Sequence, residues 1–281
     1  MLEDNFGDIV GKARFGKGWS PPELARRSKL SEGRIASIEE GAAPSAAEVD
    51  LLARALGLDP QKLLTIAEGA WEPKPIRGDW ARWIERIDGR IGSYPVNGYL
   101  LIDTEKREGA LFDTGCSPDR VLRILKDRQI RLSALCVTHG HPDHIGGADA
   151  IHAATDAPIY LHPDELSGGA RPSSKGIVLL QEGMKISAGR FKIGFFRTPG
   201  HTPGGTTFFV EAKAPAAFVG DALFAGSLGR AQASSTYPLL LRSVRDAILS
   251  LPKETALFPG HGPATTVEEE RARNPFFVGA D

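Results

Sequence analysis

The sequence predicts an α+β fold, in which a small all-helical domain precedes a larger domain of two β-sheets packed face to face with helices outside. The first residues, up to about 68, have the pattern of short capped helices. From about residue 80, strand patterns alternate with helix patterns. We therefore predict a helical domain over 1–68, a linker over 69–79 and a sheet-containing domain over 80–281.

Five short helices are predicted in the first domain. The segment "NFGDIVGKARF" is the first, and the other four begin after residues that commonly cap helices. Proline or an acidic residue directly follows three of these caps, and glycines mark several helix ends. The predicted caps are Ser20, Ser31, Ser45 and Asp59. The stretch "GAWEPKPIRGD" then has two prolines and two glycines, which is typical of a linker.

A weak internal repeat predicts the two sheets. Residues 99–115 form two strands that end at Asp113, followed by a helix over 117–130 and a strand that runs into "THGH". Residues 206–224 repeat this order, with Asp221 after the second strand, then a helix and a strand that runs into "PGHG". Aspartate and histidine, residues that can bind metal ions, thus follow strands in both halves. We expect these strand ends to meet along one edge of the sandwich.

Composition excludes several classes of protein. The net charge of -1 gives no signature of a nucleic-acid coat or a membrane-surface protein. No apolar run approaches the roughly 20 residues that span a bilayer, and no secretory leader is visible. Cys116 and Cys136 are too few for a disulfide framework. We expect a soluble cytoplasmic protein without a membrane partner, with Cys136 buried in an apolar strand and Cys116 a loop residue without a redox role.

The stretch "THGHPDHIGG" concentrates metal-ligand chemistry. His139 and His141 are two apart after a strand, which directs both rings the same way in extended chain. Asp143 and His144 follow a proline that opens a helix, so they can face a second position. Four candidate ligands in one stretch exceed what one tetrahedral ion usually takes from a single loop.

Three later residues complete a candidate metal site. His201 and His261 lie in turns fixed by glycine and proline, and Asp221 directly follows an apolar strand. Five histidines and two aspartates suit zinc, iron or manganese. We leave out His152, which we expect to be exposed on a helix, and His162, which we expect to be structural.

This pattern resembles the His-x-His-x-Asp-His signature of the metallo-β-lactamase superfamily. The likeness covers about residues 90–275 and is greatest to glyoxalase II-like hydrolases, through "VNGYLLID", "GDALFAGSLGR" and "LFPGHGPATTVEEERARNPFF". It implies an αββα sandwich and two metal ions. The resemblance assigns His139, His141 and His201 to the first ion, and Asp143, His144 and His261 to the second. It makes Asp221 the bridge and Asp113 a residue that orients ligands.

The resemblance also implies a reaction. Two divalent ions, zinc first with iron or manganese as alternatives, would activate water for attack on the carbonyl of a small thioester or activated ester, and Asp143 would pass a proton. Two departures bear on the substrate. Only 20 residues follow His261, so the C-terminal helical region of longer glyoxalase II enzymes is missing, and Ala231-Gln232 replaces the usual Thr-Asp. A mononuclear iron persulfide dioxygenase is the rival, but the complete set of ligands favours two metals.

Residues 8–66 resemble the Cro/repressor-type helix-turn-helix family of the xenobiotic-response-element group, through "ELARRSKLSEGRIASIEEG". The resemblance implies a DNA-binding domain that can form a homodimer, with Ser31, Arg34 and Ser37 on its recognition helix as the candidate DNA contacts. Residues 1–70 carry nine Lys/Arg against eleven Asp/Glu, a net charge of -2 that does not help DNA binding. An interaction or dimerisation module therefore stays open. So does a transcription regulator that uses the metal domain as a metabolite sensor.

Overall fold

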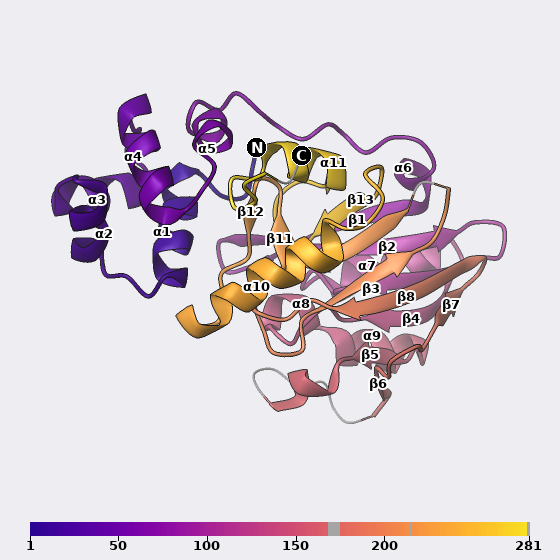
Figure 1. Ribbon diagram of the computed structural model, residues 1–281. Coiled ribbons are helices and arrows are strands. Elements are labelled where there is room, and N and C mark those ends of the chain that lie inside the picture. Colours follow the sequence, from indigo (N-terminus) through magenta and orange to yellow (C-terminus); the bar gives the residue numbers. More distant parts are fainter. Residues whose placement is uncertain (168–174, 214, 280–281) are drawn as a thin grey trace.

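The structure is a computed structural model that describes residues 1–167, 175–213 and 215–279. Its first part contains all five predicted helices, at one end of the molecule (Figure 1). The longest of them have 11 residues, and no helix in the described ranges is long and apolar enough to cross a membrane. The helices are α1 (Phe6–Gly16), α2 (Pro21–Ser28), α3 (Glu32–Glu39), α4 (Ala46–Leu56) and α5 (Pro60–Ala67).

The predicted caps hold the first turns of α2 to α5. Ser20, Ser31 and Ser45 each accept a hydrogen bond from the backbone N–H three residues on, and Asp59 accepts from two such groups. These bonds satisfy donors that the helices themselves leave unpaired. Residues 69–79, all of which are described, contain no helix or strand, as expected of a linker.

The second part contains two six-stranded sheets, each a mixture of parallel and antiparallel pairs. The first follows the order of the chain: β1 (Ile84–Ile91), β2 (Tyr94–Asp103), β3 (Glu108–Phe112), β4 (Arg131–Cys136), β5 (Ile159–Leu161) and β6 (Ile177–Leu179). The second has the order β14 (Thr265–Thr266), β13 (Ala256–Pro259), β10 (Ala216–Gly220), β9 (Thr206–Val210), β8 (Phe191–Arg197) and β7 (Ile186–Ala188). A small hairpin of β11 (Leu223–Phe224) and β12 (Ser227–Leu228) follows β10.

The internal repeat is confirmed. In the first sheet β2 and β3 are antiparallel, and α7 (Pro118–Asp127) crosses over to β4, which runs parallel to β3. In the second sheet β9 and β10 are antiparallel, and α10 (Tyr237–Ser243) with a π-helical turn over Val244–Ile248 crosses over to the parallel β13. Parallel neighbours need such crossovers, which carry the chain back to the same edge of the sheet. Both halves therefore present their strand ends at one edge.

Several elements were not predicted. They are β1, β5, β6, β7, β14, the β11–β12 hairpin, the short helix α6 (Trp80–Trp83) and the C-terminal helix α11 (Val267–Arg273). Strands β5, β6 and β7 have only three residues each, too few to show an alternating pattern. Strand β1 is mostly exposed and its sequence "IERIDGRI" is largely polar, so its pairing with β2 rather than its own pattern makes it a strand.

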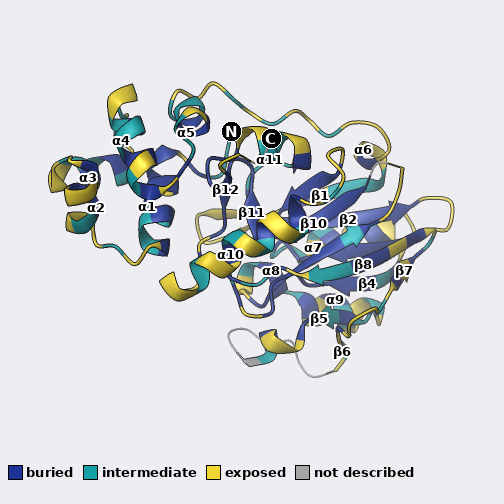
Figure 2. Ribbon diagram, viewed as in Figure 1, coloured by how far each residue is buried: buried dark blue, intermediate teal, exposed yellow. Residues whose placement is uncertain are grey.

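Three apolar layers hold the fold together, and inner strands such as β10 are entirely buried (Figure 2). Helices α7 and α9 (Ala148–Thr155) pack on the outer face of the first sheet through residues such as Val121 and Ile151. The two sheets pack on each other through aromatic side chains, among which Phe112 and Phe218 stack with ring centroids 3.6 Å apart. The outer face of the second sheet packs against α10, α11 and the helical domain.

The stacked pair gives a prediction about stability. Phe218→Ala removes a fully buried ring from between the sheets, and the cavity should lower the free energy of unfolding by about 3–5 kcal/mol in urea denaturation. Leu239→Ala, which truncates an exposed side chain on α10, should change it by less than about 0.5 kcal/mol. Equal effects of the two substitutions would contradict the assignment of the core.

Candidate metal centre

The seven predicted ligand residues meet at the edge where the strands of both halves end. His139 and His141 follow β4, and Asp143 and His144 lie in the short helix α8 (Pro142–Ile145). His201 lies in the loop between β8 and β9. Asp221 follows β10 and His261 follows β13. Their side chains form three overlapping groups, in each of which the ligand atoms lie within 4.8 Å of one another: His139/His141/His201, His139/His144/Asp221 and Asp143/His144/His261.

In the first group, three ring nitrogens face one another. Nδ1 of His141 lies 3.0 Å from Nε2 of His139 and 3.0 Å from Nε2 of His201. The ring of His139 is nearly perpendicular to both of the other rings. His139 is buried, whereas His141 is exposed, so the group is open to solvent on the side of His141.

In the group of Asp143, His144 and His261, called the second group below, a carboxylate oxygen lies near two ring nitrogens. Nε2 of His261 lies 3.3 Å from Oδ2 of Asp143, and Nε2 of His144 lies 3.5 Å from the same oxygen. Asp221 lies between the two groups, because its carboxylate is 3.3 Å from His144, 3.4 Å from His261 and 3.5 Å from His201. Asp221 is therefore close to ligand atoms of both groups.

The outer ring nitrogens are held by polar partners. His201 Nδ1 lies 2.7 Å from the carbonyl oxygen of Arg230, and His261 Nδ1 lies 2.6 Å from that of Pro95. A carbonyl only accepts, so these two nitrogens carry the hydrogen when they are bonded. Each Nε2 then presents its lone pair to the cluster. This arrangement fixes the tautomer that binds a metal ion.

Asp113 lies directly beside the cluster. Its carboxylate accepts hydrogen bonds from the backbone N–H and the hydroxyl of Thr138, both at 2.8 Å, and lies 2.8 Å from Nδ1 of His144. Asp113 holds a backbone φ of +54°, which is uncommon for a residue other than glycine. The strained turn aims the carboxylate back at the ligand loop, so Asp113 orients His144 and the start of the loop together.

The cluster has the properties that a cation site needs. Nε2 of His144 and Oδ1 of Asp221 are buried, and neither has a hydrogen-bond partner among the described residues. Unpaired buried polar atoms are costly unless something binds them. A side chain at Gly260 would lie 2.3 Å from Asp221 and 2.4 Å from His144, so only glycine leaves room there. The donor set and the unpaired atoms therefore fit divalent metal ions.

The electrostatics differ between the two groups. Burial lowers the pKa of His139 and of His201, so both rings stay neutral at pH 7. For His144 burial acts in the same direction, but the carboxylates of Asp221 and Asp113 outweigh it and raise the pKa to about 9. In His261, Asp143 and Asp221 likewise overcome burial and raise the pKa to about 11. In the absence of a metal, His144 and His261 are therefore protonated at pH 7, whereas His139 and His201 are not.

Glu165 also supports the cluster, and the sequence analysis missed it. It is buried in a 3-10 turn over Pro163–Ser167, and its carboxylate accepts two backbone hydrogen bonds of 2.7 Å, from Gly140 and from Gly204. Gly140 lies between His139 and His141, and Gly204 belongs to the loop of His201. Glu165 therefore connects both loops of the three-histidine group. Nothing local in "HPDEL" distinguishes it from an exposed acid.

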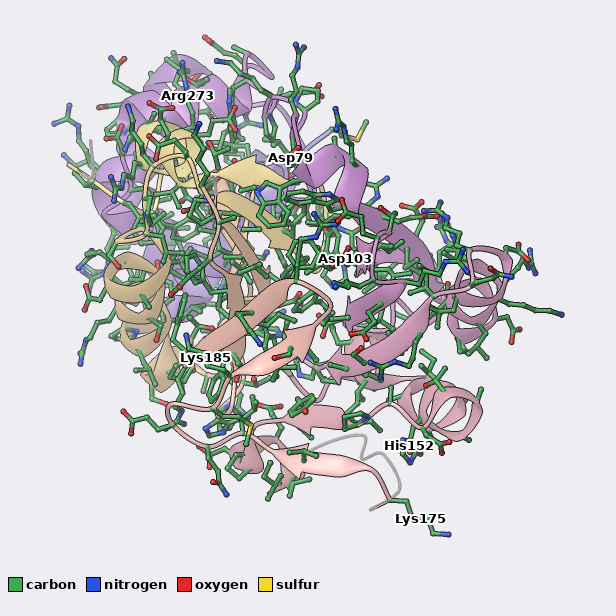
Figure 3. All side chains as sticks on the ribbon, turned by 90° about the vertical axis from the view of Figure 1, so that its right-hand side faces the viewer. Asp79, Asp103, His152, Lys175, Lys185 and Arg273 are labelled. Carbon is green, nitrogen blue, oxygen red and sulfur yellow. The ribbon has the colours of Figure 1, made fainter. Side chains whose placement is uncertain are left out.

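The remaining histidines lie outside the cluster. We expected His152 to be exposed, but it is half-buried, because its Nδ1 bonds the carbonyl of Ala157 and its ring packs on Gly176. Figure 3 shows it at the edge of the molecule near Lys175. His162 is buried and its Nδ1 accepts from the backbone of Asp164, which is the structural role predicted for it.

Both cysteines are free thiols. Cys136 is fully buried in β4, as predicted. Cys116 is half-buried beside the ligand loop, with Sγ 3.3 Å from the carbonyl oxygen of Pro142. Burial, together with the charge of Asp143, raises the pKa of the Cys116 thiol. A raised pKa disfavours the reactive thiolate, in agreement with a loop residue that has no redox role.

The candidate DNA contacts are engaged within the helical domain. Ser31 caps α3, and Ser37 donates to the carbonyl of Gly33. Arg34 forms a bidentate pair with Glu48, at 2.6 and 2.9 Å, and donates to the carbonyl of Ala43. Arg34 is thus paired with a residue of α4. Its guanidinium must break the ion pair with Glu48 before it can bind a DNA phosphate.

Comparison with known proteins identifies both parts of the chain. Residues 91–261, more than half of the chain, match the metallo-beta-lactamase superfamily. The chain belongs to this superfamily. Residues 6–64 match a helix-turn-helix domain, so this member carries a helix-turn-helix domain before its metallo-β-lactamase fold. Both matches lie inside the domains predicted from the sequence.

Three similar proteins illustrate the range of the superfamily around this chain. The probable metallo-hydrolase YqgX of Bacillus subtilis is 33% identical over 67% of this chain and 95% of its own length. Hydroxyacylglutathione hydrolase GloC of Haemophilus influenzae is 29% identical over 66% of this chain and 94% of its own length. The structure of TTHA1623 in a di-iron-bound form has 32% identity and a TM-score of 0.57, over 68% of this chain and 100% of that one.

The two groups should respond differently to pH. His144 and His261, with pKa values of about 9 and about 11, are protonated at pH 7, so a metal ion must displace their protons. Binding there should weaken by roughly tenfold per pH unit for each displaced proton as the pH falls, whereas His139 and His201, whose pKa values are lowered by burial, release none at pH 7. Calorimetric titration in buffers of different ionisation enthalpy measures this release. Equal proton release from both groups would contradict the assignment.

Glu165→Gln should loosen the three-histidine group, because its amide would turn a donor toward one of the two N–H groups. We expect metal affinity at this group to fall about tenfold or more, as is usual when a residue that supports a ligand is altered. Competition with a chromophoric chelator measures the affinity. Glu182→Gln, an exposed acid, is the matched control. Unchanged affinity in Glu165→Gln would show that the two loops hold their positions without it.

Proposed function

We propose that this metallo-β-lactamase superfamily member is a binuclear metal-dependent hydrolase of a small thioester or activated ester. The observation that carries the proposal is the complete pair of ligand groups sharing Asp221. A mononuclear site would use only one of these groups. We assign His139, His141 and His201 to one ion, and Asp143, His144 and His261 to the other, with Asp221 between them.

Zinc is the metal we propose, with iron or manganese as alternatives. Imidazole and carboxylate donors suit all three ions, so the donor set alone does not rank them. The di-iron form of TTHA1623 makes iron a substantial alternative for a relative of this similarity. Metal ions bound here would supply a nucleophile from water and stabilise negative charge on a substrate oxygen.

Residues of this chain have distinct parts in the proposed reaction. His141 is exposed, so a substrate can reach the cluster on its side, whereas His139 and His144 are buried. The half-buried Asp143 lies at the boundary between them, with Oδ2 3.3 Å from Nε2 of His261. A carboxylate in this place can accept a proton from water and return it to a leaving group. Asp143 is therefore our candidate for the proton-transfer residue.

A thioester of the hydroxyacylglutathione type is the substrate to test first. The likeness to GloC supports this choice, although at 29% identity it gives a class rather than a specific compound. Thioester leaving groups depart easily, so no nucleophilic serine or cysteine is needed. The raised pKa of Cys116 agrees with its having no such part.

The helix-turn-helix domain supports DNA binding as a second function. Helices α2 and α3 lie at the outer end of the molecule, away from the sheets, so a duplex can approach them (Figure 1). Ser31, Arg34 and Ser37 stay our candidate contacts. Arg26 and Arg27 both pair with Glu23, so basic side chains here already have acidic partners. We therefore rank hydrolysis first. The cytoplasmic location, the homodimer and the domain boundaries stay predictions.

Metal content and thioester hydrolysis, measured on the wild type and on His261→Ala, test the proposal. The wild type should hold two ions per chain. His261→Ala should hold fewer and lose activity by at least about 100-fold, since loss of a ligand costs more than loss of its support. His152→Ala, a histidine outside the cluster, is the matched control and should retain both properties.

Other outcomes point to the rival functions. One iron per chain, with oxygen uptake on a persulfide that survives His261→Ala, would indicate the dioxygenase. Tight operator-sized DNA binding without metal-linked turnover would indicate a regulator that uses the metal domain as a metabolite sensor.

A further inference from the structure

Helix α1 of the helix-turn-helix domain contacts a segment next to the ligand His261. The ammonium of Lys12 donates to the carbonyl of Leu228 at 2.8 Å and lies 4.6 Å from the centre of the Phe224 ring. The Phe224 ring in turn meets the ring of His261 edge-on, with centroids 5.6 Å apart at 79°. One side chain therefore separates Lys12 from a metal ligand, and that side chain belongs to the β11–β12 hairpin.

The same helix reaches the ligand His201 by a second route. The guanidinium of Arg230 lies 4.4 Å from the centre of the Phe15 ring, a cation–π contact. The carbonyl of Arg230 accepts from Nδ1 of His201 at 2.7 Å. Phe15 thus contacts the side chain of Arg230, and the backbone carbonyl of Arg230 orients His201. The two routes start one helical turn apart on α1 and end in different ligand groups.

The docking of the helical domain is extensive rather than a loose tether. Residues of α1, α4 and α5 belong to one continuous apolar cluster with α10, β11–β12 and the C-terminal segment. Gly16 lies flat against the ring of Tyr237, where a side chain would come within 2.4 Å. The carboxylate of Asp4 binds both Lys12 and Ser227 at 2.5 Å. Lys62 donates to the carbonyl oxygens of Arg271 and Phe277.

Helix α1 is also tied to the outer helix α3. Arg14 of α1 forms a bidentate pair with Glu39 at the end of α3, with both distances 2.6 Å. Both side chains are largely shielded from solvent, and bidentate pairs fix relative orientation. A contiguous set of contacts therefore runs from the recognition helix through α1 to the metal ligands.

We propose that α1 is a positioning element of the metal centre, in which Phe15 and Lys12 hold His201 and His261 through Arg230 and Phe224. The helix-turn-helix domain then forms part of the site. Because coupling between sites is reciprocal, a metal ion that stabilises these ligands also stabilises the docked domain. The inference rests on the metal centre and not on hydrolysis, so it can hold even where the proposed substrate fails.

Cobalt(II) titration of the full chain tests this role. The probe is Co²⁺ alone, followed through its visible spectrum, which reports ligand geometry as well as affinity. Phe15→Ala and Lys12→Met should each weaken Co²⁺ binding by about tenfold and change the spectrum, as loss of a ligand-supporting contact does. Phe15→Tyr retains the ring beneath Arg230 and should restore both. Arg54→Ala, which breaks an exposed pair with Asp50 on α4, is the control.

The outcomes separate positioning from mere stability. Circular dichroism should show that the variants retain their helices, since neither Phe15 nor Lys12 belongs to the apolar cluster through which α1 docks. Wild-type affinity and spectrum in both Phe15→Ala and Lys12→Met would overturn the proposal. So would loss of Co²⁺ binding in Arg54→Ala to the same extent. If Phe15→Ala does not fold, the Co²⁺ affinities and spectra of Lys12→Met and Phe15→Tyr test the proposal in its place. Absence of thioester turnover in a wild type that binds Co²⁺ would contradict the proposed function alone.

Discussion

Five imidazoles and two carboxylates converge at one edge of the sheet sandwich, and this convergence constrains the rest of the structure. Nε2 of His144 and Oδ1 of Asp221 are buried without a hydrogen-bond partner, which is unfavourable unless a cation binds them. The supporting contacts serve this arrangement. Asp113, which has a positive φ, holds Nδ1 of His144 with its carboxylate. Both carboxylate oxygens of Glu165 accept hydrogen bonds from the backbone of the loops that carry ligands.

The duplicated topology explains why the cluster can form. Each half brings two antiparallel strands, a crossover and a parallel strand to the same edge, so ligands far apart in the chain meet there. The first half supplies the loop from His139 to His144, and the second supplies Asp221 and His261. Asp221 joins the two groups because β10 ends between them. The stacked rings of Phe112 and Phe218 fix the two sheets at the distance that this meeting needs.

Local patterns were sufficient to predict much of the fold and the residues that cluster at the sheet edge. The caps of α2 to α5 and the spacing of His139, His141, Asp143 and His144 are properties of short segments, so they were readable in the sequence. Glu165 was not, because its role arises from two loops that only the fold brings to it. Arg34 shows the same limit, since its pairing with Glu48 depends on how α3 packs on α4. The docking of α1 on the β11–β12 hairpin is long-range packing, which no local pattern indicates.

The central claim is that two metal ions occupy this edge and share Asp221. Crystals of the full chain loaded with zinc, measured on both sides of the zinc absorption edge, test it most directly. The account predicts two anomalous peaks, one at about 2.0–2.2 Å from the inward nitrogens of His139, His141 and His201, and one at the same range from Asp143, His144 and His261. A single peak at either group, or zinc bound only elsewhere, would contradict the binuclear centre.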